Sequence, residues 1–412
     1  MKKIILTAGL LLISSSMFYP VLAKNITLSN GSWNIQTKQK LEKLLNANVN
    51  KGKKVIFDFD NTIVSGDIGD ATFAWLIKEK QVDLNKIKAI SPDFTIDGKK
   101  ISIGTATDPT EYYEKIMEAY SYDKNDITGP LIGYSWVVQT MDGKTPFNII
   151  EASRNAYMDN KSANDRQAGT ETIIEVTPGK TAYKVPFYRP ETVNLIGNLI
   201  LNGFDVYIVS ASNVWSVRYM ITKELTKLMK KEFGKNLSIK PENIYGINTL
   251  VRDKRNGQLY KDSYLVKNNR KYASLDSKEL SNYELTNQLV NPLSGYEGKT
   301  SIIQNFITKK GEKPFLVAGD SPGDFSMLTL SENRLWFARL ESYNYQKKII
   351  SLIKENKNGQ WFIQPILYKK KHGLVNNMNQ LKKLLNDNKD FIKASDVVSL
   401  LEKSFLLKDF GK

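Results

Sequence analysis

The sequence predicts an α/β fold built on a parallel β-sheet that helices cover on both faces. Three short, almost continuously apolar runs are expected to be strands: residues 53–59, 204–209 and 314–318. Segments with the apolar spacing of helices lie between them. Strands that are apolar on both faces are typical of parallel sheets buried between helices. The core is therefore expected to be a Rossmann-like parallel sheet.

Composition limits the chemistry that this chain can perform. The 412 residues, 41% hydrophobic and 25% charged, suffice for one large domain with an insertion or for two domains. With no cysteine and only His372 as histidine, cysteine phosphatases, cysteine proteases and zinc sites built from several imidazoles or thiolates are excluded. Any chemistry is therefore expected to be carried by carboxylates, hydroxyls, lysines or a hard metal. The net charge of +16 favours anionic partners such as phosphorylated molecules.

Residues 1–23 are predicted to be a cleavable signal peptide. Lys2 and Lys3 precede an apolar stretch at 4–13, and Val21-Leu22-Ala23 places small side chains where signal peptidase needs them. The apolar stretch is about half of the roughly 20 residues that a membrane span requires. We therefore expect an exported protein, periplasmic or secreted, without a transmembrane segment.

Each of the three predicted strands ends in a polar cluster. The clusters are residues 58–62, 210–213 and 319–324. In open α/β sheets, ligands bind beyond the carboxyl ends of the strands. The three clusters are therefore expected to form one site.

These clusters resemble the motifs of the haloacid dehalogenase superfamily, in the order of that family. The sequence DFDNT at 58–62 matches the first motif, Ser210 the second, Lys299 the third, and GDSPGD at 319–324 the fourth. The resemblance spans roughly residues 53–340. It implies the fold of that superfamily, with a mainly helical cap domain inserted after the first motif, and Mg²⁺ as cofactor.

The two acids of the first motif indicate the reaction. Asp58, ionised at neutral pH, can attack phosphorus and form an aspartyl-phosphate. Asp60 can protonate the leaving oxygen and later activate water. In the resembled superfamily, dehalogenases lack this second carboxylate and transport ATPases carry threonine there. Asp60 therefore favours a phosphatase or phosphotransferase.

The remaining site residues follow from the resemblance and from charge. The expected Mg²⁺ ligands are Asp58, Asp60 through its carbonyl, Asp320 and Asp324. The expected phosphate-binding residues are Thr62, Ser210, Ala211 and Lys299. Lys299 is supported by Gly298, which allows close backbone approach, and by Thr300, which can begin a helix.

The domain limits are set by the motifs. The core is predicted at 24–65 and 187–345, and the cap at 66–186, a stretch far longer than a strand crossover needs. Within the core, 242–260 is predicted to be a hairpin turning at Asn256-Gly257, and 261–295 a polar surface insertion. Residues 346–412 are predicted to be an extension packed on the core, with amphipathic helices at 345–356, 378–385 and 396–406 and a strand at 361–365.

The cap contains a dense aromatic stretch. Residues 112–136 hold six tyrosines and tryptophans. Tyr120, Tyr122 and Trp136 are candidates for a pocket that binds an organic cation by cation–π attraction. The alternative interpretation is an aromatic cap core.

The expected partner is a small phosphorylated substrate. Export, the motif set, the long cap and the aromatic stretch at 361–365 together resemble the bacterial phosphorylcholine phosphatases of this superfamily, which implies choline phosphate. A broad acid phosphatase, a phosphoserine phosphatase-like enzyme and a catalytically silent surface-binding protein on the same fold are the alternatives. No nucleic-acid motif accompanies the lysines, so Lys369-Lys370-Lys371 are interpreted as solvated or as making weak contact with anionic surfaces.

Overall fold

The structure is a computed structural model that describes residues 25–124, 129–158, 172–268, 272, 274–275, 277–355, 358–386, 388–404, 406–407 and 410. The predicted signal peptide at 1–23 lies outside these residues. Within them, every helix is too short or too polar to cross a membrane.

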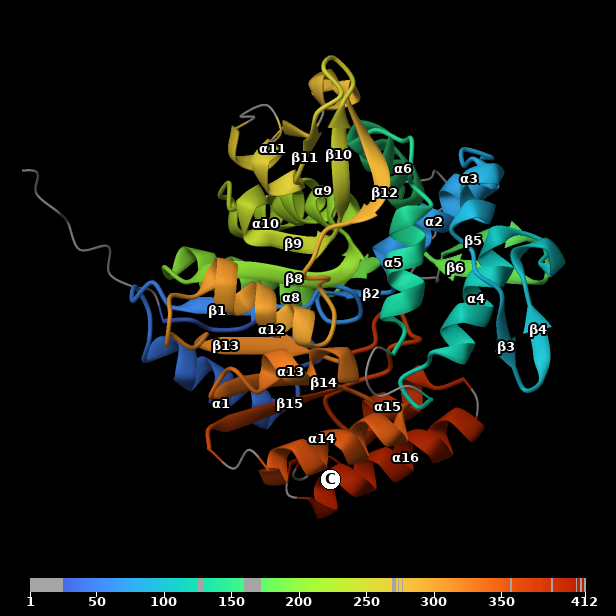
Figure 1. The fold of residues 1–412 in the computed structure, drawn as a ribbon. Coiled ribbons are helices and arrows are strands. Elements are labelled where there is room, and N and C mark those ends of the chain that lie inside the picture. The colour runs from blue at the N-terminus through green and yellow to red at the C-terminus, as the bar shows by residue number, and fades with distance from the viewer. Residues whose placement is uncertain are drawn as a thin grey trace, which may run out of the picture.

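A six-stranded, fully parallel sheet forms the centre of the molecule (Figure 1). Its order is β15-β14-β13-β1-β8-β9. The strands are β1 (Lys54–Phe57), β8 (Asp205–Asn213), β9 (Ile244–Ile247), β13 (Leu316–Gly319), β14 (Asn333–Arg339) and β15 (Gln360–Ile366). The three predicted runs become β1, β8 and β13, which are neighbours in the sheet. The predicted α/β fold with a parallel sheet is thus confirmed.

Alternation along each central strand divides the interior into two cores. In β1, Val55 and Phe57 face one core and Ile56 faces the other, and all three side chains are fully buried. In β13, Val317 shares the core of Ile56. A strand that is buried on both faces needs apolar residues at every position, which is why these runs lack the polar alternation of exposed sheets.

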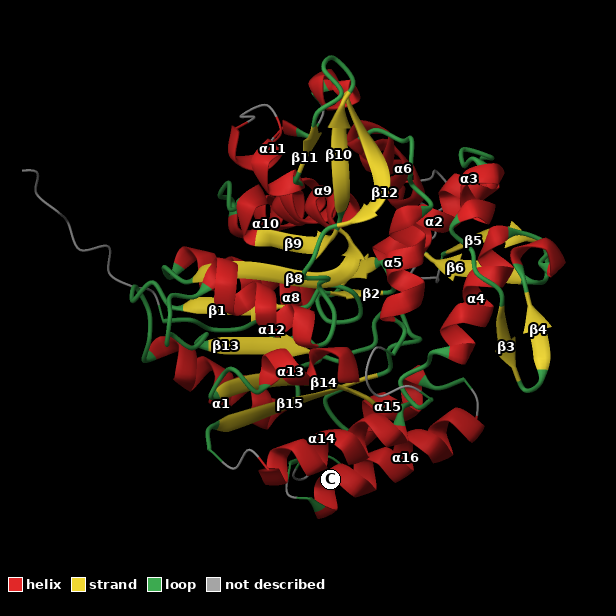
Figure 2. Ribbon diagram, in the orientation of Figure 1, coloured by secondary structure: helices red, strands yellow, loops and turns green. Residues whose placement is uncertain are grey.

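Helices cover both faces of this sheet (Figure 2). The first core receives side chains from α1 (Ile35–Asn46) and α8 (Pro190–Leu201). The second core receives them from α12 (Glu297–Ile302), α14 (Tyr343–Glu355) and α16 (Asn388–Lys403). Both layers leave the carboxyl ends of the strands free to carry a site.

The cap enters and leaves the core at a single point. Strand β2 (Val64–Ser65) pairs antiparallel with β7 (Phe187–Tyr188), and the chain between them forms the insertion. Its helices are α2 (Ile68–Lys78), α3 (Leu84–Ala89), α4 (Pro109–Ala119), α5 (Leu131–Gln139) and α6 (Pro146–Met158). Two hairpins complete it: β3 (Phe94–Ile96) with β4 (Lys99–Ile101), and β5 (Ile173–Thr177) with β6 (Thr181–Lys184). The insertion is mainly helical, as predicted.

A second insertion lies between β9 and α12. It contains β10 (Thr249–Asp253), β11 (Leu259–Tyr260), α11 (Asp262–Asn268) and β12 (Tyr283–Leu289). Helices α9 (Val214–Tyr219) and α10 (Thr226–Phe233) lie before it, between β8 and β9. The predicted hairpin is present as β10 and β11, and Gly257 in its turn has φ +75°. The stretch 261–295 differs from the predicted polar surface insertion: β12 pairs with β10, buries Leu285, and bonds the cap backbone at Gly143 and Lys144.

The main sheet extends past the limit predicted for the core at residue 345. Strand β15 lies at its edge and pairs with β14 over seven residues. Pro365 is tolerated inside this strand because an edge strand has one side without a ladder partner. Helix α15 (Met378–Leu384) and α16 follow. The segment beyond 345 is therefore partly a component of the central sheet.

Candidate active site

The three polar clusters meet at the carboxyl edge of the sheet, around a pocket with a volume of about 490 Å³, part of which is open to solvent. Asp58 follows β1 and Asp320 follows β13, while β8 continues past its predicted end and carries Ser210 to Ser212 along the same edge.

Lys299 holds two of the buried carboxylates together. Its Nζ lies 2.6 Å from Asp58 Oδ1 and 2.7 Å from Asp324 Oδ1, and its side chain is only 3% exposed. Burial raises the pKa of Asp58 to about 8, against the attraction of Lys299. The same two carboxylates raise the pKa of Lys299 despite its burial. Lys299 therefore stays charged, and its positive charge offsets the negative charge of the two acids.

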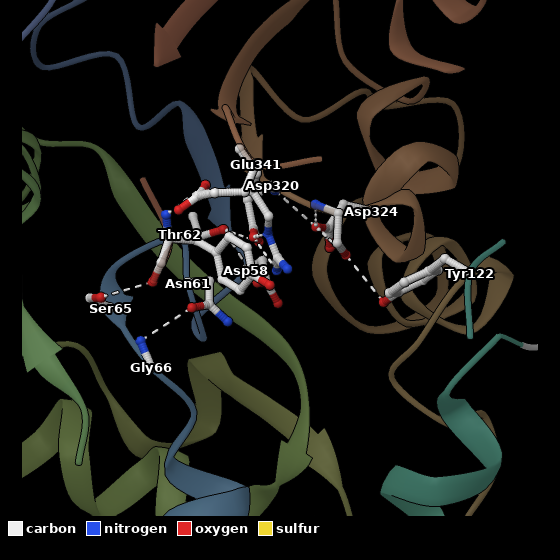
Figure 3. Close-up of polar contacts among 12 residues, drawn as sticks. Asp58, Asn61, Thr62, Ser65, Gly66, Tyr122, Asp320, Asp324 and Glu341 are labelled. Atoms are coloured by element: carbon white, nitrogen blue, oxygen red, sulfur yellow. Dashed lines mark hydrogen bonds and ion pairs between the residues drawn. The ribbon is translucent and has the colours of Figure 1, made fainter. Parts of the chain in front are cut away.

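Asp324 also fixes the fourth-motif loop. Its Oδ2 accepts the backbone N–H groups of Asp320 and Ser321, both at 3.0 Å (Figure 3). Gly319 is required beside it, because a Cβ there would lie 2.6 Å from the Asp324 Cβ. One carboxylate thus organises the loop and reaches Lys299 with its other oxygen.

Asp320 is paired with a cation that the sequence interpretation missed. Arg339, at the end of β14, forms an ion pair with Asp320, and its guanidinium lies 4.6 Å from the Tyr368 ring centroid and 5.7 Å from that of Tyr345. Burial raises the pKa of Asp320, while Arg339 opposes that shift. Arg339 also lines the pocket and adds positive charge to it.

Asp58, Asp320 and Asp324 could hold a metal ion. All three are buried, and one oxygen of each lies within 4.8 Å of the others. Carboxylate oxygens are the ligands that hard divalent cations prefer, and a cation would offset negative charge that burial makes costly. Asp60 is predicted to bind the metal through its backbone carbonyl, and its side chain lies outside this cluster.

Asp60 is held in a separate hydrogen-bond network. Its Oδ1 accepts the backbone N–H of Ile68 at 2.9 Å, and its Oδ2 accepts the hydroxyls of Ser210 at 3.1 Å and Ser212 at 2.8 Å. Burial, with the nearby charge of Asp67, raises the pKa of Asp60 well above its usual value. Asp60 therefore has the proton affinity that a general acid needs.

A buried arginine secures the loop after Asp60. Arg189, at the start of α8, donates from Nη1 to the carbonyls of Asn61, Thr62 and Val64 at 2.7–2.9 Å. Asn61 has φ +58°, a strained conformation for a residue with a side chain. The arginine, which no local pattern in the sequence marks, stabilises this turn.

The predicted phosphate-binding residues divide into two groups. Lys299 and Ala211 line the pocket. Thr62 and Ser210 are instead fully buried: Thr62 donates to Asp320 at 2.9 Å, and Ser210 donates to Asp60. Both hydroxyls therefore help to orient carboxylates of the site. Ser212, which was not predicted, lines the pocket beside Ala211.

Of the three aromatic candidates, Tyr122 lines the pocket. Tyr120 instead packs on Phe94. Trp136 is 3% exposed, packs on Tyr112 and donates its Nε1–H to Ser91, so it belongs to the cap core.

The aromatic residues that join Tyr122 at the pocket are Tyr134 and Tyr296. Tyr134 and Trp136 are two residues apart in α5, and such positions point in nearly opposite directions around a helix. Helical spacing in the sequence could therefore have predicted that Tyr134 and Trp136 face different surroundings. The pocket wall also includes Asp67, the N-cap residue of α2, which the sequence interpretation did not single out.

The chain is distantly similar to known proteins. No family model matches the chain. The chain is 24% identical over 333 residues to the phosphorylcholine phosphatase of Pseudomonas aeruginosa, covering 80% of this chain and 86% of that protein. A solved structure of a conserved, functionally unknown protein from Anaerococcus prevotii superposes with a TM-score of 0.56 at 17% identity, covering 86% of this chain and 98% of that one.

A phosphoserine phosphatase solved as a phospho-aspartyl intermediate analogue gives a TM-score of 0.32 at 13% identity, covering 69% of this chain and 86% of that one. This likeness is too weak for any residue to be transferred. The parallel sheet with its inserted, mainly helical cap agrees with the fold that the resemblance to the haloacid dehalogenase superfamily implies, and the match to the Pseudomonas protein is a distant similarity to a phosphatase.

Replacing Lys299 should destabilise the protein in a pH-dependent way. Lys299→Met leaves two buried carboxylates without their cation, and we expect a loss of about 3–5 kcal/mol in the free energy of unfolding at pH 8. The loss should shrink toward pH 5, where the acids can take up protons instead. Urea unfolding in the presence of a chelator measures this.

Lys54→Met is the matched control, because Lys54 pairs with Glu312 at 2.6 Å near the surface. That variant should cost less than about 1 kcal/mol at either pH. Equal, pH-independent losses in both variants would contradict the role given to Lys299.

Proposed function

We propose that the protein is an exported, Mg²⁺-dependent phosphomonoesterase that acts through an aspartyl-phosphate on Asp58 and prefers choline phosphate. The observation that carries this proposal is the pairing of Asp58, buried beside Lys299, with a second acid of raised pKa two residues further along the same strand end. A nucleophile and a proton donor are thus present in one pocket.

Charge neutralisation is the first requirement of the reaction. Lys299 and Arg339 both line the pocket and can face the anionic phosphoryl oxygens. Mg²⁺ would be held by Asp58, Asp320 and Asp324 with the backbone carbonyl of Asp60, and when bound it supplies positive charge against the phosphoryl group. These groups compensate for the absence of a histidine cluster.

Two steps then follow on the acids. An oxygen of Asp58 attacks phosphorus, the bond from phosphorus to the ester oxygen breaks, and Asp60 gives its proton to the departing alcohol. In the second step, water attacks phosphorus and gives a proton to Asp60 as the bond to Asp58 breaks. Phosphate leaves, and both acids return to their starting states.

The aromatic part of the pocket wall suits a quaternary ammonium headgroup. Tyr122, Tyr134 and Tyr296 line it together with the carboxylate of Asp67. Aromatic faces attract a cation that cannot donate hydrogen bonds, and a carboxylate adds to that attraction. Asp67 would at the same time repel the carboxylate of serine phosphate, which favours choline phosphate over a phosphoserine phosphatase-like specificity. This wall replaces the pocket predicted from Tyr120, Tyr122 and Trp136.

Export is part of the proposal and rests on the predicted signal peptide at 1–23. An enzyme in the periplasm or outside the cell would meet phosphomonoesters released from lipids. The positive net charge of +16 favours such anionic substrates.

The two acids should be separable by the leaving group. Asp58→Asn removes the nucleophile and should abolish turnover of every substrate. Asp60→Asn removes the proton donor, so it should retain measurable phosphorylation by aryl phosphates, whose leaving oxygen needs little protonation. Rapid-quench assays of phosphoenzyme with an aryl phosphate and choline phosphate measure both. Identical, complete loss in the two variants with every substrate would refute this division of roles.

Metal binding should depend on pH. Because burial raises the pKa of Asp58 to about 8, a cation bound at neutral pH must displace a proton. The affinity for Mg²⁺ should therefore rise between pH 6 and pH 8, by up to about tenfold per pH unit for one proton. Calorimetry in two buffers of different ionisation enthalpy measures the release.

Chelation should abolish turnover, and added Mg²⁺ should restore it. The Asp58→Asn variant should bind Mg²⁺ without this proton release, which provides the internal control. Full activity after exhaustive chelation would contradict the metal requirement.

The substrate preference can be tested with a matched pair of esters. Choline phosphate should have a lower KM than its uncharged carbon isostere, in which a tert-butyl group replaces the trimethylammonium group. Tyr134→Leu should raise the KM for choline phosphate about 2- to 30-fold and change the KM of the isostere much less. Tyr264→Leu, at a tyrosine on α11 that is 47% exposed, is the control and should change neither. Better turnover of sugar phosphates or of serine phosphate would refute the choline assignment.

A further inference from the structure

We propose that helix α14 positions the cap residue Tyr122 over the active site, with Lys348 as the positioning residue, and so determines the specificity for the substrate headgroup. This inference rests on the proposed function for its substrate. The contact between α14 and the cap can be tested independently of that function.

Tyr122 lies where the cap meets the fourth-motif loop. It follows α4, and its hydroxyl lies 3.2 Å from Ser321 Oγ (Figure 3). Gly323 leaves room for it, because a Cβ at that position would lie 2.8 Å from the tyrosine hydroxyl. The ring centroid of Tyr296 is 5.7 Å away. Tyr122 is therefore fitted against the loop that carries Asp320 and Asp324.

Helix α14 contacts this cap segment through three side chains. Lys348 Nζ donates to the backbone carbonyl of Tyr122 at 3.0 Å. The Tyr345 ring meets the Tyr122 ring edge to face, at 5.6 Å and 83°. Asn344 Nδ2 lies 3.5 Å from Asp123 Oδ1. Spacings of three and four residues place these side chains on one face of the helix.

The same helix connects Tyr122 to the metal-binding acids. Tyr345, which meets the Tyr122 ring, also lies against the guanidinium of Arg339. Arg339 in turn forms the ion pair with Asp320. A shift of α14 would therefore move the wall of the headgroup pocket relative to the phosphoryl-binding end.

The chain beyond β14 also contacts the base of the cap. Ser65 Oγ, in β2, donates to the carbonyl of Lys370 at 2.9 Å. The His372 ring lies 4.6 Å from the ring of Phe187, in β7. Both strands through which the cap joins the core thus contact the same C-terminal region that contacts Tyr122. The placement of the cap depends on a region outside the four motifs.

Lys348 does not face the phosphoryl group. It lines an outer groove with Tyr122 and Tyr296, whereas the inner pocket contains Asp58 and Lys299. The two tyrosines belong to both and separate them. The charge of Lys348 therefore lies outside the reacting centre. Lys348 acts through its hydrogen bond to the Tyr122 carbonyl.

Three variants test this assignment. Lys348→Met keeps the aliphatic stem and removes the hydrogen bond, Lys348→Arg restores a donor, and Lys347→Met changes the exposed neighbouring lysine. Lys348→Met should raise the KM for choline phosphate about 2- to 10-fold, the range for one lost hydrogen bond, with little change in kcat. Lys348→Arg should recover most of this loss, and Lys347→Met should match the wild type.

Hydrogen–deuterium exchange of peptides covering 120–124 provides a readout that needs no substrate. Exchange there should accelerate in Lys348→Met and not in Lys347→Met. Exchange equal to the wild type in Lys348→Met, or a fall in kcat with the KM unchanged, would overturn the positioning role. A wild-type enzyme that does not hydrolyse choline phosphate would refute the proposed function alone, because the exchange result would still decide the contact of α14 with Tyr122.

Discussion

The ammonium group of Lys299 is the interaction on which the rest of the site depends. It joins an acid after β1 to an acid after β13, and it reaches them from α12, an element that follows a long insertion. Without it, two carboxylates would be buried at adjacent strand ends without the cation that contacts both. Lys299 therefore links the end of β1 to the fourth-motif loop and favours the ionised form of Asp58.

The same electrostatic requirement explains the other buried basic residues. Arg339 opposes the charge of Asp320, and Arg189 binds three carbonyls of the strained loop after Asp60. Each arginine lies at the end of a different element, so the two join separate elements around one pocket. The same contacts position the acids and stabilise the fold, because a pocket rich in buried carboxylates persists only where fixed positive charge surrounds it.

The sequence predicted those features of the fold and of the site that a local pattern of residues encodes. The apolar runs identified β1, β8 and β13, and the acids that follow them proved to be neighbours, because the ends of parallel strands meet at one edge. Arg189 and β12 were missed because they contact segments more than a hundred residues away in the sequence. Arg339 was missed because no local pattern marks its contact with Asp320, 19 residues earlier. Thr62 and Ser210 were identified as parts of the site, but their bonds to Asp320 and Asp60 were not predicted, since spacing along the chain does not say which carboxylate a hydroxyl will contact.

The pairing of β14 with β15 has a consequence for the order in which the molecule can be assembled. The cap is complete by residue 186, but the β15 edge of the sheet, the α14 residues that contact Tyr122 and the residues that contact the cap base all come after residue 332. A ribosome that has made the cap and all four motifs has therefore not yet made Arg339 or Lys348. The nascent chain carries every acid of the pocket before it has the segments that contact the cap, so the complete pocket should form only after residue 372 has been synthesised.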